Sequence, residues 1–184
     1  MNTNLSEKKA LLVIDMQKGS FTPKTPRFDT DGVTARINKL ADLFRQNDWP
    51  VIFIQHDGTR ENIFIPNTEE WELLDGIEAL PDDQYVSKIA NDCFYHSDLK
   101  NVIKQQQVKE LYFTGCATDF CVEATIQSAV AKDYHITVVS DGHTTGERPK
   151  LTAKQVIDHY NWTWQNMIPT KGSLRVKSSK EIVN

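Results

Sequence analysis

The stretch FTGCATDFCVE at residues 113–123 decides how the rest of this chain is interpreted. An apolar strand pattern ends within it and a helical pattern begins, which predicts a strand that turns directly into a helix. Cys121 falls in the first turn of that helix, where backbone N–H groups have no partner within the helix. These donors and the helix dipole would stabilise a thiolate, so we expect the pKa of the Cys121 thiol to lie below its free value of about 8.5. The same donors could bind the oxyanion that forms when a thiolate attacks a carbonyl.

Outward from this stretch, strand and helix patterns alternate along the chain. Apolar runs typical of buried parallel strands occur at residues 10–14, 51–54, 111–113 and 136–139, with a weaker run at 85–88. Apolar residues recur at helical spacing over 33–44 and 122–130, and a third helix is expected over 153–167. Alternating strands and helices form right-handed βαβ units. We therefore expect one α/β domain over residues 1–184, a doubly wound, mainly parallel sheet of about six strands with helices on both faces.

The bulk composition narrows the functional class. Of 184 residues, 39% are hydrophobic and 25% charged, and the net charge is −4 without a basic stripe, so nucleic acid is not an expected partner. No apolar run reaches the roughly 18–20 residues that span a bilayer, so a membrane is not expected either. The polar start, Met1 to Lys9, is unlike a secretory signal. The odd set Cys93, Cys116 and Cys121 predicts reduced thiols in a cytoplasmic protein.

Three reactive side chains follow or end different predicted strands. Asp15 ends the first strand, Lys88 lies at the end of the third, and Cys121 opens the helix after the fourth. Each alone has an ordinary explanation, as a turn residue, a solvated amine and a buried small side chain. Because ligands bind beyond the carboxyl ends of strands in an open parallel sheet, we expect the three to meet at one edge. An acid and an ammonium beside a thiol would let its proton pass to the acid at modest cost.

Four colinear motifs carry a resemblance to a known family. They are LVIDMQ at 12–17, VIFIQHDG at 51–58, the lysine segment from Lys88 to Leu99, and GCATDFCV at 115–122. Together they resemble the isochorismatase-like cysteine hydrolase superfamily over nearly the whole chain. The resemblance implies a Rossmann-like strand order and a catalytic triad of Asp15, Lys88 and Cys121.

The resemblance also implies a non-proline cis peptide in the loop before the cysteine, which we place at Ala117–Thr118. This bond would turn the N–H of Thr118 toward the reacting carbonyl, beside the N–H of Cys121. We therefore predict a two-donor oxyanion hole; losing one such donor typically costs roughly 3–4 kcal/mol of barrier.

Four further residues are predicted to bind substrate. Gln17 lies in the first-strand motif, Phe21 and Phe94 could line an apolar cavity, and His143 sits at the carboxyl edge after the fifth strand. The alternative for both phenylalanines is that they only close the core. Two long segments without clear periodicity, residues 21–31 and 57–83, are expected to form loops that set specificity.

No cofactor is expected, and metal binding is disfavoured. Metal-dependent members of the superfamily carry an Asp-x-His pair and a second histidine, whereas this chain has Gln55-His56-Asp57 at the corresponding place. One His and one Asp do not make a metal site by themselves. This departure also argues against a nicotinamidase.

We expect a hydrolase that cleaves a carbon–nitrogen bond of a small amide, lactam or carbamoyl compound through a thioester. The motifs at 140–145 and 159–162 resemble a subgroup that includes streptothricin hydrolase-like enzymes. Two alternatives stay open: vinyl-ether hydrolysis, as in isochorismatase itself, and a non-catalytic binding module, because fold alone does not settle function. Relatives commonly pair through helix faces, so a homo-oligomer, dimer or tetramer, is expected.

Overall fold

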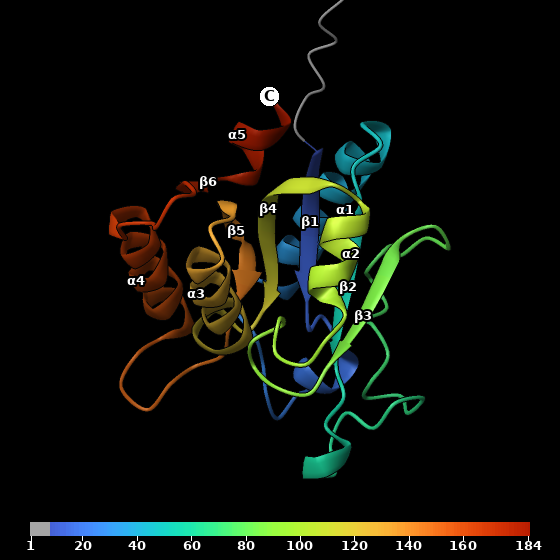
Figure 1. The fold of residues 1–184 in the computed structure, drawn as a ribbon. Helices are drawn as coiled ribbons and strands as arrows, with labels where there is room; N and C mark the ends of the chain where they lie inside the picture. Colours follow the sequence, from blue (N-terminus) through green and yellow to red (C-terminus); the bar gives the residue numbers. More distant parts are fainter. Residues whose placement is uncertain (1–7) are drawn as a thin grey trace, which may run out of the picture.

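The computed structural model describes residues 8–184, and the first seven residues of the polar N-terminal stretch lie outside this range. Its centre is a six-stranded parallel sheet with the strand order β3-β2-β1-β4-β5-β6 (Figure 1). The strands are β1 (Lys8–Ile14), β2 (Val51–His56), β3 (Gln84–Lys88), β4 (Val108–Cys116), β5 (His135–Thr144) and β6 (Leu174–Lys177). The predicted α/β fold with a doubly wound parallel sheet is confirmed.

Over residues 8–184, five α-helices and three short helical turns accompany the strands, and the last helix follows β6. The helices are α1 (Thr30–Gln46), α2 (Leu99–Gln105), α3 (Glu123–Ala131), α4 (Ala153–Asn166) and α5 (Ser179–Val183). The turns are η1 (Lys18–Ser20), η2 (Thr59–Glu61) and the π-helical turn η3 (Thr118–Val122), which runs directly into α3.

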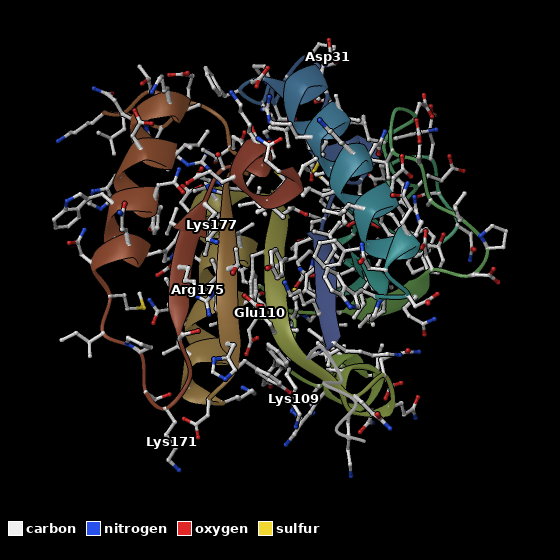
Figure 2. All side chains as sticks on the ribbon, turned by 90° about the horizontal axis from the view of Figure 1, so that it is seen from above. Asp31, Lys109, Glu110, Lys171, Arg175 and Lys177 are labelled. Atoms are coloured by element: carbon white, nitrogen blue, oxygen red, sulfur yellow. The ribbon has the colours of Figure 1, made fainter. Side chains whose placement is uncertain are left out.

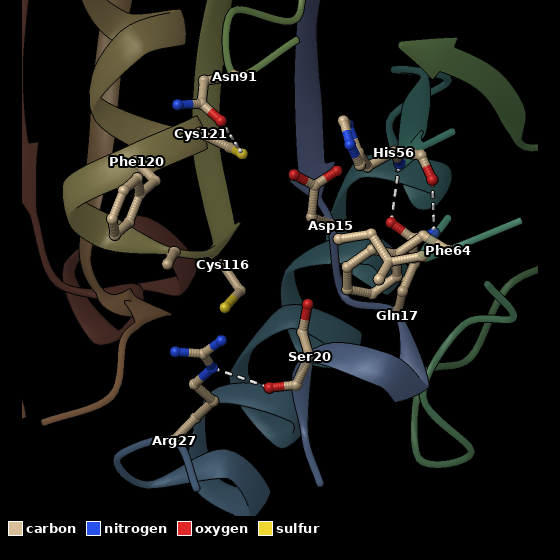
Figure 3. Close-up of a pocket in the computed structure, with 12 residues that line it drawn as sticks. Asp15, Gln17, Ser20, Arg27, His56, Phe64, Asn91, Cys116, Phe120 and Cys121 are labelled. Atoms are coloured by element: carbon tan, nitrogen blue, oxygen red, sulfur yellow. Dashed lines mark hydrogen bonds between the residues drawn. The ribbon is translucent and has the colours of Figure 1, made fainter. Parts of the chain in front are cut away.

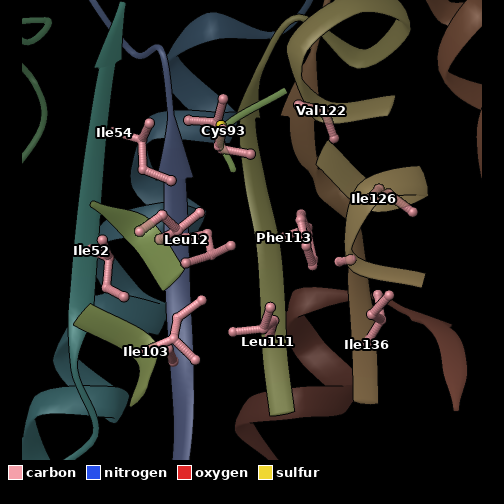
Figure 4. Packing of buried hydrophobic residues seen from close by; sticks show 14 of the residues in the cluster. Leu12, Ile52, Ile54, Cys93, Ile103, Leu111, Phe113, Val122, Ile126 and Ile136 are labelled. Carbon is pink, nitrogen blue, oxygen red and sulfur yellow. The ribbon is translucent and has the colours of Figure 1, made fainter. Parts of the chain in front are cut away.

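Two apolar cores lie on opposite faces of the sheet. One joins the sheet to α2, α3 and α4 and includes Leu12, Phe113 and Ile126 (Figure 4). The other joins the sheet to α1 and α5 and includes Leu11 and Phe44. Alternate residues of a strand point to opposite faces, so neighbours such as Leu11 and Leu12 enter different cores. This explains why the strands read as continuous apolar runs.

Charged side chains reach outward around these two layers. Lys109 and Lys171 are exposed at the periphery in Figure 2, whereas Glu110, the residue after Lys109, is buried and accepts a hydrogen bond from the hydroxyl of Thr137. None of the helices within residues 8–184 is long and apolar enough to cross a membrane.

Three elements were not predicted from the sequence. Helices α2 and α5 have only 7 and 5 residues, too few for a helical apolar pattern to stand out. Helix α5 is fixed instead by a capping box, in which Ser178 and Glu181 each bind the other's backbone N–H. Strand β6 alternates charged residues with half-buried apolar ones at the edge of the sheet, so it lacks a continuous apolar run.

The chain leaves the centre of the sheet in opposite directions from β1 and β4. From β1 it continues to β2 and β3, and from β4 to β5 and β6, so the carboxyl ends of β1 and β4 form the topological switch point where such folds bind ligands. The two strands approach closely at Gly115, which pairs with Ile14 and has a φ of 118°. A Cβ added there would lie 2.1 Å from the carbonyl oxygen of Ile14, so only glycine fits.

Candidate active site

Asp15, Lys88 and Cys121 meet at the switch point. Asp15 directly follows β1, Lys88 ends β3, and Cys121 lies in η3 after β4. The Nζ atom of Lys88 is 2.7 Å from Oδ2 of Asp15 and 3.4 Å from Sγ of Cys121. The structure therefore brings together the three side chains that the sequence singled out.

The ammonium of Lys88 has a partner for each of its three N–H groups. Besides Asp15 and Cys121, it donates to the carbonyl oxygen of Ala90 at 3.0 Å, and only 1% of the residue is exposed. Burial alone would lower the pKa of Lys88, but the charge and hydrogen bond of Asp15, together with the neighbouring Cys93 and Cys121, outweigh this effect and hold the pKa above its ordinary value. Lys88 is thus a fixed positive charge rather than a proton acceptor.

The Asp15 carboxylate is only half used. Its Oδ2 accepts from Lys88, while its Oδ1 is buried without a hydrogen-bond partner among residues 8–184. A buried acceptor without a partner is costly and uncommon in folded proteins. In Figure 3 the carboxylate of Asp15 faces the sulfur of Cys121 across the pocket. An unused acceptor beside a thiol can take up a proton.

The expected low pKa of Cys121 is wrong for the resting structure. Burial raises the pKa of the Cys121 thiol well above its ordinary value, the Asp15 carboxylate raises it further, and the charge of Lys88 offsets only part of this. Position in the first helical turn, which η3 does provide, is therefore outweighed by desolvation and by the adjacent acid. The resting pair is a neutral thiol next to a carboxylate.

The cis peptide lies one residue earlier than predicted. It joins Cys116 to Ala117, not Ala117 to Thr118. Strand β4 continues through Cys116 and η3 begins at Thr118, so Ala117 is the single residue at which the chain changes direction. Ala117 lines the cavity described below, whereas Thr118 is fully buried behind it.

A chain of hydrogen bonds holds Thr118 from behind. Asn161 donates through Nδ2 to the carbonyl of Ser140 at 2.9 Å, so its Oδ1 accepts from Nε2 of His143 at 3.1 Å. Nδ1 of His143 then accepts from the Thr118 hydroxyl at 2.9 Å. Burial lowers the pKa of His143 to about 4, so its ring stays neutral near pH 7. His143 therefore fixes the loop and does not reach the cavity, contrary to its predicted contact with substrate.

The residue after Thr118 is held equally firmly. Both carboxylate oxygens of Asp119 accept from Arg148, at 2.6 and 2.8 Å, and one also accepts from the Thr145 hydroxyl at 2.7 Å. Burial would raise the pKa of Asp119, but these hydrogen bonds and the charge of Arg148 lower it overall. The guanidinium of Arg148 also lies over the ring of Phe120, 5.1 Å from its centroid.

A cavity of about 230 Å³ opens beside the triad (Figure 3). Among its lining residues are Asp15, Cys121, Ala117, Phe64, Asn91 and Arg27. Gln17, which is predicted to bind substrate, also lines it, but its amide already bonds the backbone N–H and carbonyl of His56 and the carbonyl of Trp71. Its main contact is thus with the loop that follows β2.

Phe21 and Phe94, predicted to bind substrate, do not line this cavity. Phe21 packs at the margin of the core under α1, and Phe94 stacks on Tyr134 with ring centroids 5.7 Å apart. Both side chains pack against the apolar cores instead, which is the alternative that the sequence left open. Sequence reasoning missed Arg27, although the loop that holds it, residues 21–31, was expected to set specificity.

The side chains of His56 and Asp57 have different surroundings. The Asp57 carboxylate accepts hydrogen bonds from the backbone and hydroxyl of Thr59, while the His56 side chain lines the cavity. Burial and the charge of Lys88 lower the pKa of His56, which favours its neutral form. Within residues 8–184, no three His, Cys, Asp or Glu side chains gather as a metal site would require.

Comparison with known proteins agrees with this architecture. The isochorismatase domain model matches residues 9–165. The YddQ protein of Bacillus subtilis (strain 168), an uncharacterized isochorismatase family protein, is 32% identical over 139 residues, which cover 74% of this chain and 77% of the relative. A solved structure described as an isochorismatase family protein superposes with a TM-score of 0.83 at 28% identity, covering 92% of this chain and 98% of its own.

Some of the similar proteins are named by an activity. A ureidoacrylate amidohydrolase of Caulobacter vibrioides is 26% identical over 174 residues, covering 74% of this chain and 77% of that enzyme. A streptothricin hydrolase of Streptomyces noursei is 28% identical over 141 residues, and the match covers 77% of this chain but only 56% of that enzyme. Assignment to a streptothricin hydrolase-like subgroup therefore stays a prediction. From the domain match and these relatives, we conclude that the chain belongs to the isochorismatase family.

Proposed function

We propose that this chain is a cysteine hydrolase that cleaves a carbon–nitrogen bond of a small molecule through a thioester on Cys121. The observation that carries the proposal is the Asp15 carboxylate in the cavity that Cys121 lines. One of its oxygens is paired with Lys88, and the other has no hydrogen-bond partner in the part of the chain that the structure describes. The relatives named for hydrolase and amidohydrolase activity support the reaction class.

In the first half-reaction, Asp15 takes the proton of the Cys121 thiol as the sulfur attacks the carbonyl carbon. The ammonium of Lys88, 3.4 Å from the sulfur, stabilises the negative charge that develops there. The C–S bond forms and the carbonyl oxygen becomes an oxyanion. When the carbonyl reforms, the C–N bond breaks and the leaving nitrogen takes the proton from Asp15. The products are a thioester and a free amine or ammonia.

In the second half-reaction, Asp15 takes a proton from water as the water oxygen attacks the thioester carbon. The new oxyanion collapses, the C–S bond breaks, and the leaving sulfur takes the proton back from Asp15. A carboxylic acid, or a carbamic acid from a carbamoyl substrate, leaves the cavity. Lys88 stays charged throughout because each of its N–H groups keeps an acceptor.

The oxyanion donors in this scheme are the backbone N–H groups of Ala117 and Cys121. Ala117 replaces the predicted Thr118 because Ala117 and Cys121 both line the cavity. The Thr118 hydroxyl is used by His143 and is not available to the substrate. Backbone donors of this kind are fixed before the reaction, which is what makes them effective.

Substitution of the nucleophile tests the proposal. Across a panel of small amides, lactams and carbamoyl compounds, the wild-type protein should release ammonia or amine. Cys121→Ala should lower this turnover on the order of 10⁵-fold or more, with an unchanged unfolding midpoint. Cys93→Ala is the matched control, because Cys93 is buried in the core and is not among the residues that line the cavity, so a variant that still folds should keep activity.

Mass spectrometry after a rapid acid quench supplies an independent readout. The acyl group should appear on a peptide that contains Cys121 during turnover. Full activity in Cys121→Ala would sink the thioester scheme and would favour vinyl-ether chemistry or a non-covalent mechanism instead.

A further inference from the structure

The cavity beside the triad has a positively charged end. Arg27, in the loop before α1, lines the cavity together with Ser20. Nε of Arg27 donates to the carbonyl of Ser20 at 2.8 Å, which fixes the plane of the guanidinium (Figure 3). Figure 3 shows the guanidinium beside Cys116, on the side of the pocket away from His56.

Among the residues that the structure describes, Arg27 differs from the other half-buried arginines in having no carboxylate partner. Arg36 pairs with Asp29, and the guanidiniums of Arg45 and Arg148 likewise bind acids, Asp83 and Asp119. Over residues 8–184, no carboxylate lies within 4.0 Å of the Arg27 guanidinium, and its two terminal nitrogens have no hydrogen-bond partner. A partly buried cation without a counter-charge is costly, so a ligand that supplies one would be bound strongly.

The remaining charges around the cavity do not cancel that of Arg27. The Asp15 carboxylate is already paired with Lys88 at 2.7 Å, and Asp119 on the neighbouring loop is saturated by Arg148. The hydroxyl of Ser20 has no partner among the described residues and points into the same space in Figure 3. One end of the cavity therefore holds a planar cation and a hydroxyl, and the other end holds the nucleophile.

Resting on the proposed hydrolase function, we propose that Arg27 binds a carboxylate of the substrate. The enzyme would then act on a small amide or carbamoyl compound that also carries a carboxylate group. The planar guanidinium offers two parallel N–H donors that match the two oxygens of a carboxylate. The cavity of about 230 Å³ favours a compact molecule in which the two groups are a few bonds apart.

Two alkylating reagents test the charge preference without a known substrate. Iodoacetate and iodoacetamide differ only in a carboxylate against a neutral amide, and both alkylate thiols. The ratio of their rates at Cys121, divided by the same ratio for free cysteine, measures how far the cavity favours the anion. Because a charged hydrogen bond contributes about 1.5–3 kcal/mol, this normalised ratio should exceed one by about tenfold or more.

Arg27→Gln should reduce the normalised ratio about tenfold or more, towards the value for free cysteine, and Arg27→Lys should keep part of it. Arg175→Gln, which removes an exposed charge on β6, is the matched control and should leave the ratio unchanged. A ratio that Arg27→Gln does not alter would overturn the carboxylate site while leaving Cys121 as nucleophile. A Cys121 that reacts with neither reagent would overturn the proposed function itself.

Two measurements on the wild-type protein cover the case in which Arg27→Gln does not fold. Propionate should slow the modification of Cys121 by iodoacetamide more than propionamide does at equal concentration. Succinamate should also release ammonia faster than 4-oxopentanamide, which replaces its carboxylate by an acetyl group of similar shape. Equal protection by the two competitors, or equal turnover of the two amides, would contradict the carboxylate site.

Discussion

Two polar networks lie on either side of the Thr118–Val122 turn, and they differ in one respect. The closed network consists of Asp119 with Arg148 and Thr145, and Thr118 with His143 and Asn161; its carboxylate and its imidazole have partners on every polar atom. The open network consists of Asp15, Lys88 and Cys121, and within residues 8–184 Oδ1 of Asp15 has no hydrogen-bond partner.

Both networks lie at the same edge of the sheet, yet among residues 8–184 only the open one leaves a buried carboxylate oxygen without a hydrogen-bond partner. A carboxylate whose oxygens all accept hydrogen bonds loses several of them if it takes up a proton. The pKa of Asp119 is accordingly lowered, because the hydrogen bonds and the charge of Arg148 outweigh the opposing effect of burial. An acceptor without a partner loses none. A carboxylate with a charged partner therefore does not by itself indicate a catalytic site in this protein. A carboxylate oxygen without a hydrogen-bond partner next to a nucleophile does.

The largest effect should come from neutralising one acid in each network. Asp15→Asn should lower kcat by roughly 10²–10⁴-fold, because the thiol loses its base. Asp119→Asn should keep kcat within several-fold but lower the free energy of unfolding by about 1–3 kcal/mol, because Arg148 loses a charged partner. Steady-state kinetics with urea unfolding of both variants makes the comparison. Equal losses of kcat would erase the distinction between the networks.

The pH dependence of stability should report the closed network. Because burial lowers the pKa of His143 to about 4, the unfolded chain binds a proton between roughly pH 6.5 and 4 that the folded chain does not. The neutral His143 therefore makes its full contribution to the free energy of unfolding above roughly pH 6.5. This contribution, roughly 3 kcal/mol, is lost as the pH falls through this window. Urea unfolding as a function of pH measures it. His143→Gln should flatten the slope, and an unaltered slope would show that His143 does not titrate as described.

The reactivity of Cys121 should report the open network. If the thiol proton passes to Asp15, the rate of iodoacetamide modification is independent of pH while Asp15 is ionised and the thiol is protonated. A plateau from about pH 6 to 8 is therefore expected. Asp15→Asn should replace it by a rise of about tenfold per pH unit below the thiol pKa. Such a rise in the wild-type protein would contradict internal proton transfer.

The two buried cysteines serve as internal controls in this measurement. Burial raises the pKa of Cys93 and of Cys116 to about 12, so both should stay unmodified at neutral pH while the protein is folded. Fragmentation of the modified peptides by tandem mass spectrometry distinguishes the three sites, because Cys116 and Cys121 share one tryptic peptide.

The smallest effect is expected outside both networks. Phe94→Leu removes the stacking on Tyr134 but touches neither the cavity nor the triad, so kcat/KM should change by less than about twofold for a protein that still folds. The unfolding midpoint measured alongside separates packing from catalysis. A tenfold rise in KM would contradict this prediction and would indicate that Phe94 contacts the substrate.

The sequence predicted the open network well because topology alone brings it together. Lys88 ends a parallel strand, Asp15 directly follows one, and Cys121 lies in the turn after another, and the carboxyl ends of these strands share one edge of the sheet. The closed network was not predicted in the same way. Asn161 comes from a helix and Arg148 from an irregular turn, and no periodic pattern relates either of them to Thr118 or Asp119.

Loop side chains and protonation states were the least predictable features. Arg27 belongs to a loop whose path the sequence does not encode in any repeating pattern, and only the folded chain shows it at the cavity. The pKa of Cys121 was predicted in the wrong direction, because helix position can be read from sequence but the depth of burial cannot. The cytoplasmic location, the homo-oligomer and the single domain over the whole chain stay predictions from the sequence.

Gly115 has a consequence for anyone who would redesign this protein. Asp15 and the loop that ends at Cys121 leave adjacent strands immediately beyond the point where the backbones of Gly115 and Ile14 nearly touch. A single extra methyl group there would wedge the strands apart and separate acid from sulfur, although neither reactive residue had been altered. Directed-evolution libraries that seek new substrates should therefore hold this position constant and diversify the Arg27 loop, where mutations can reshape recognition without disturbing the spacing on which turnover depends.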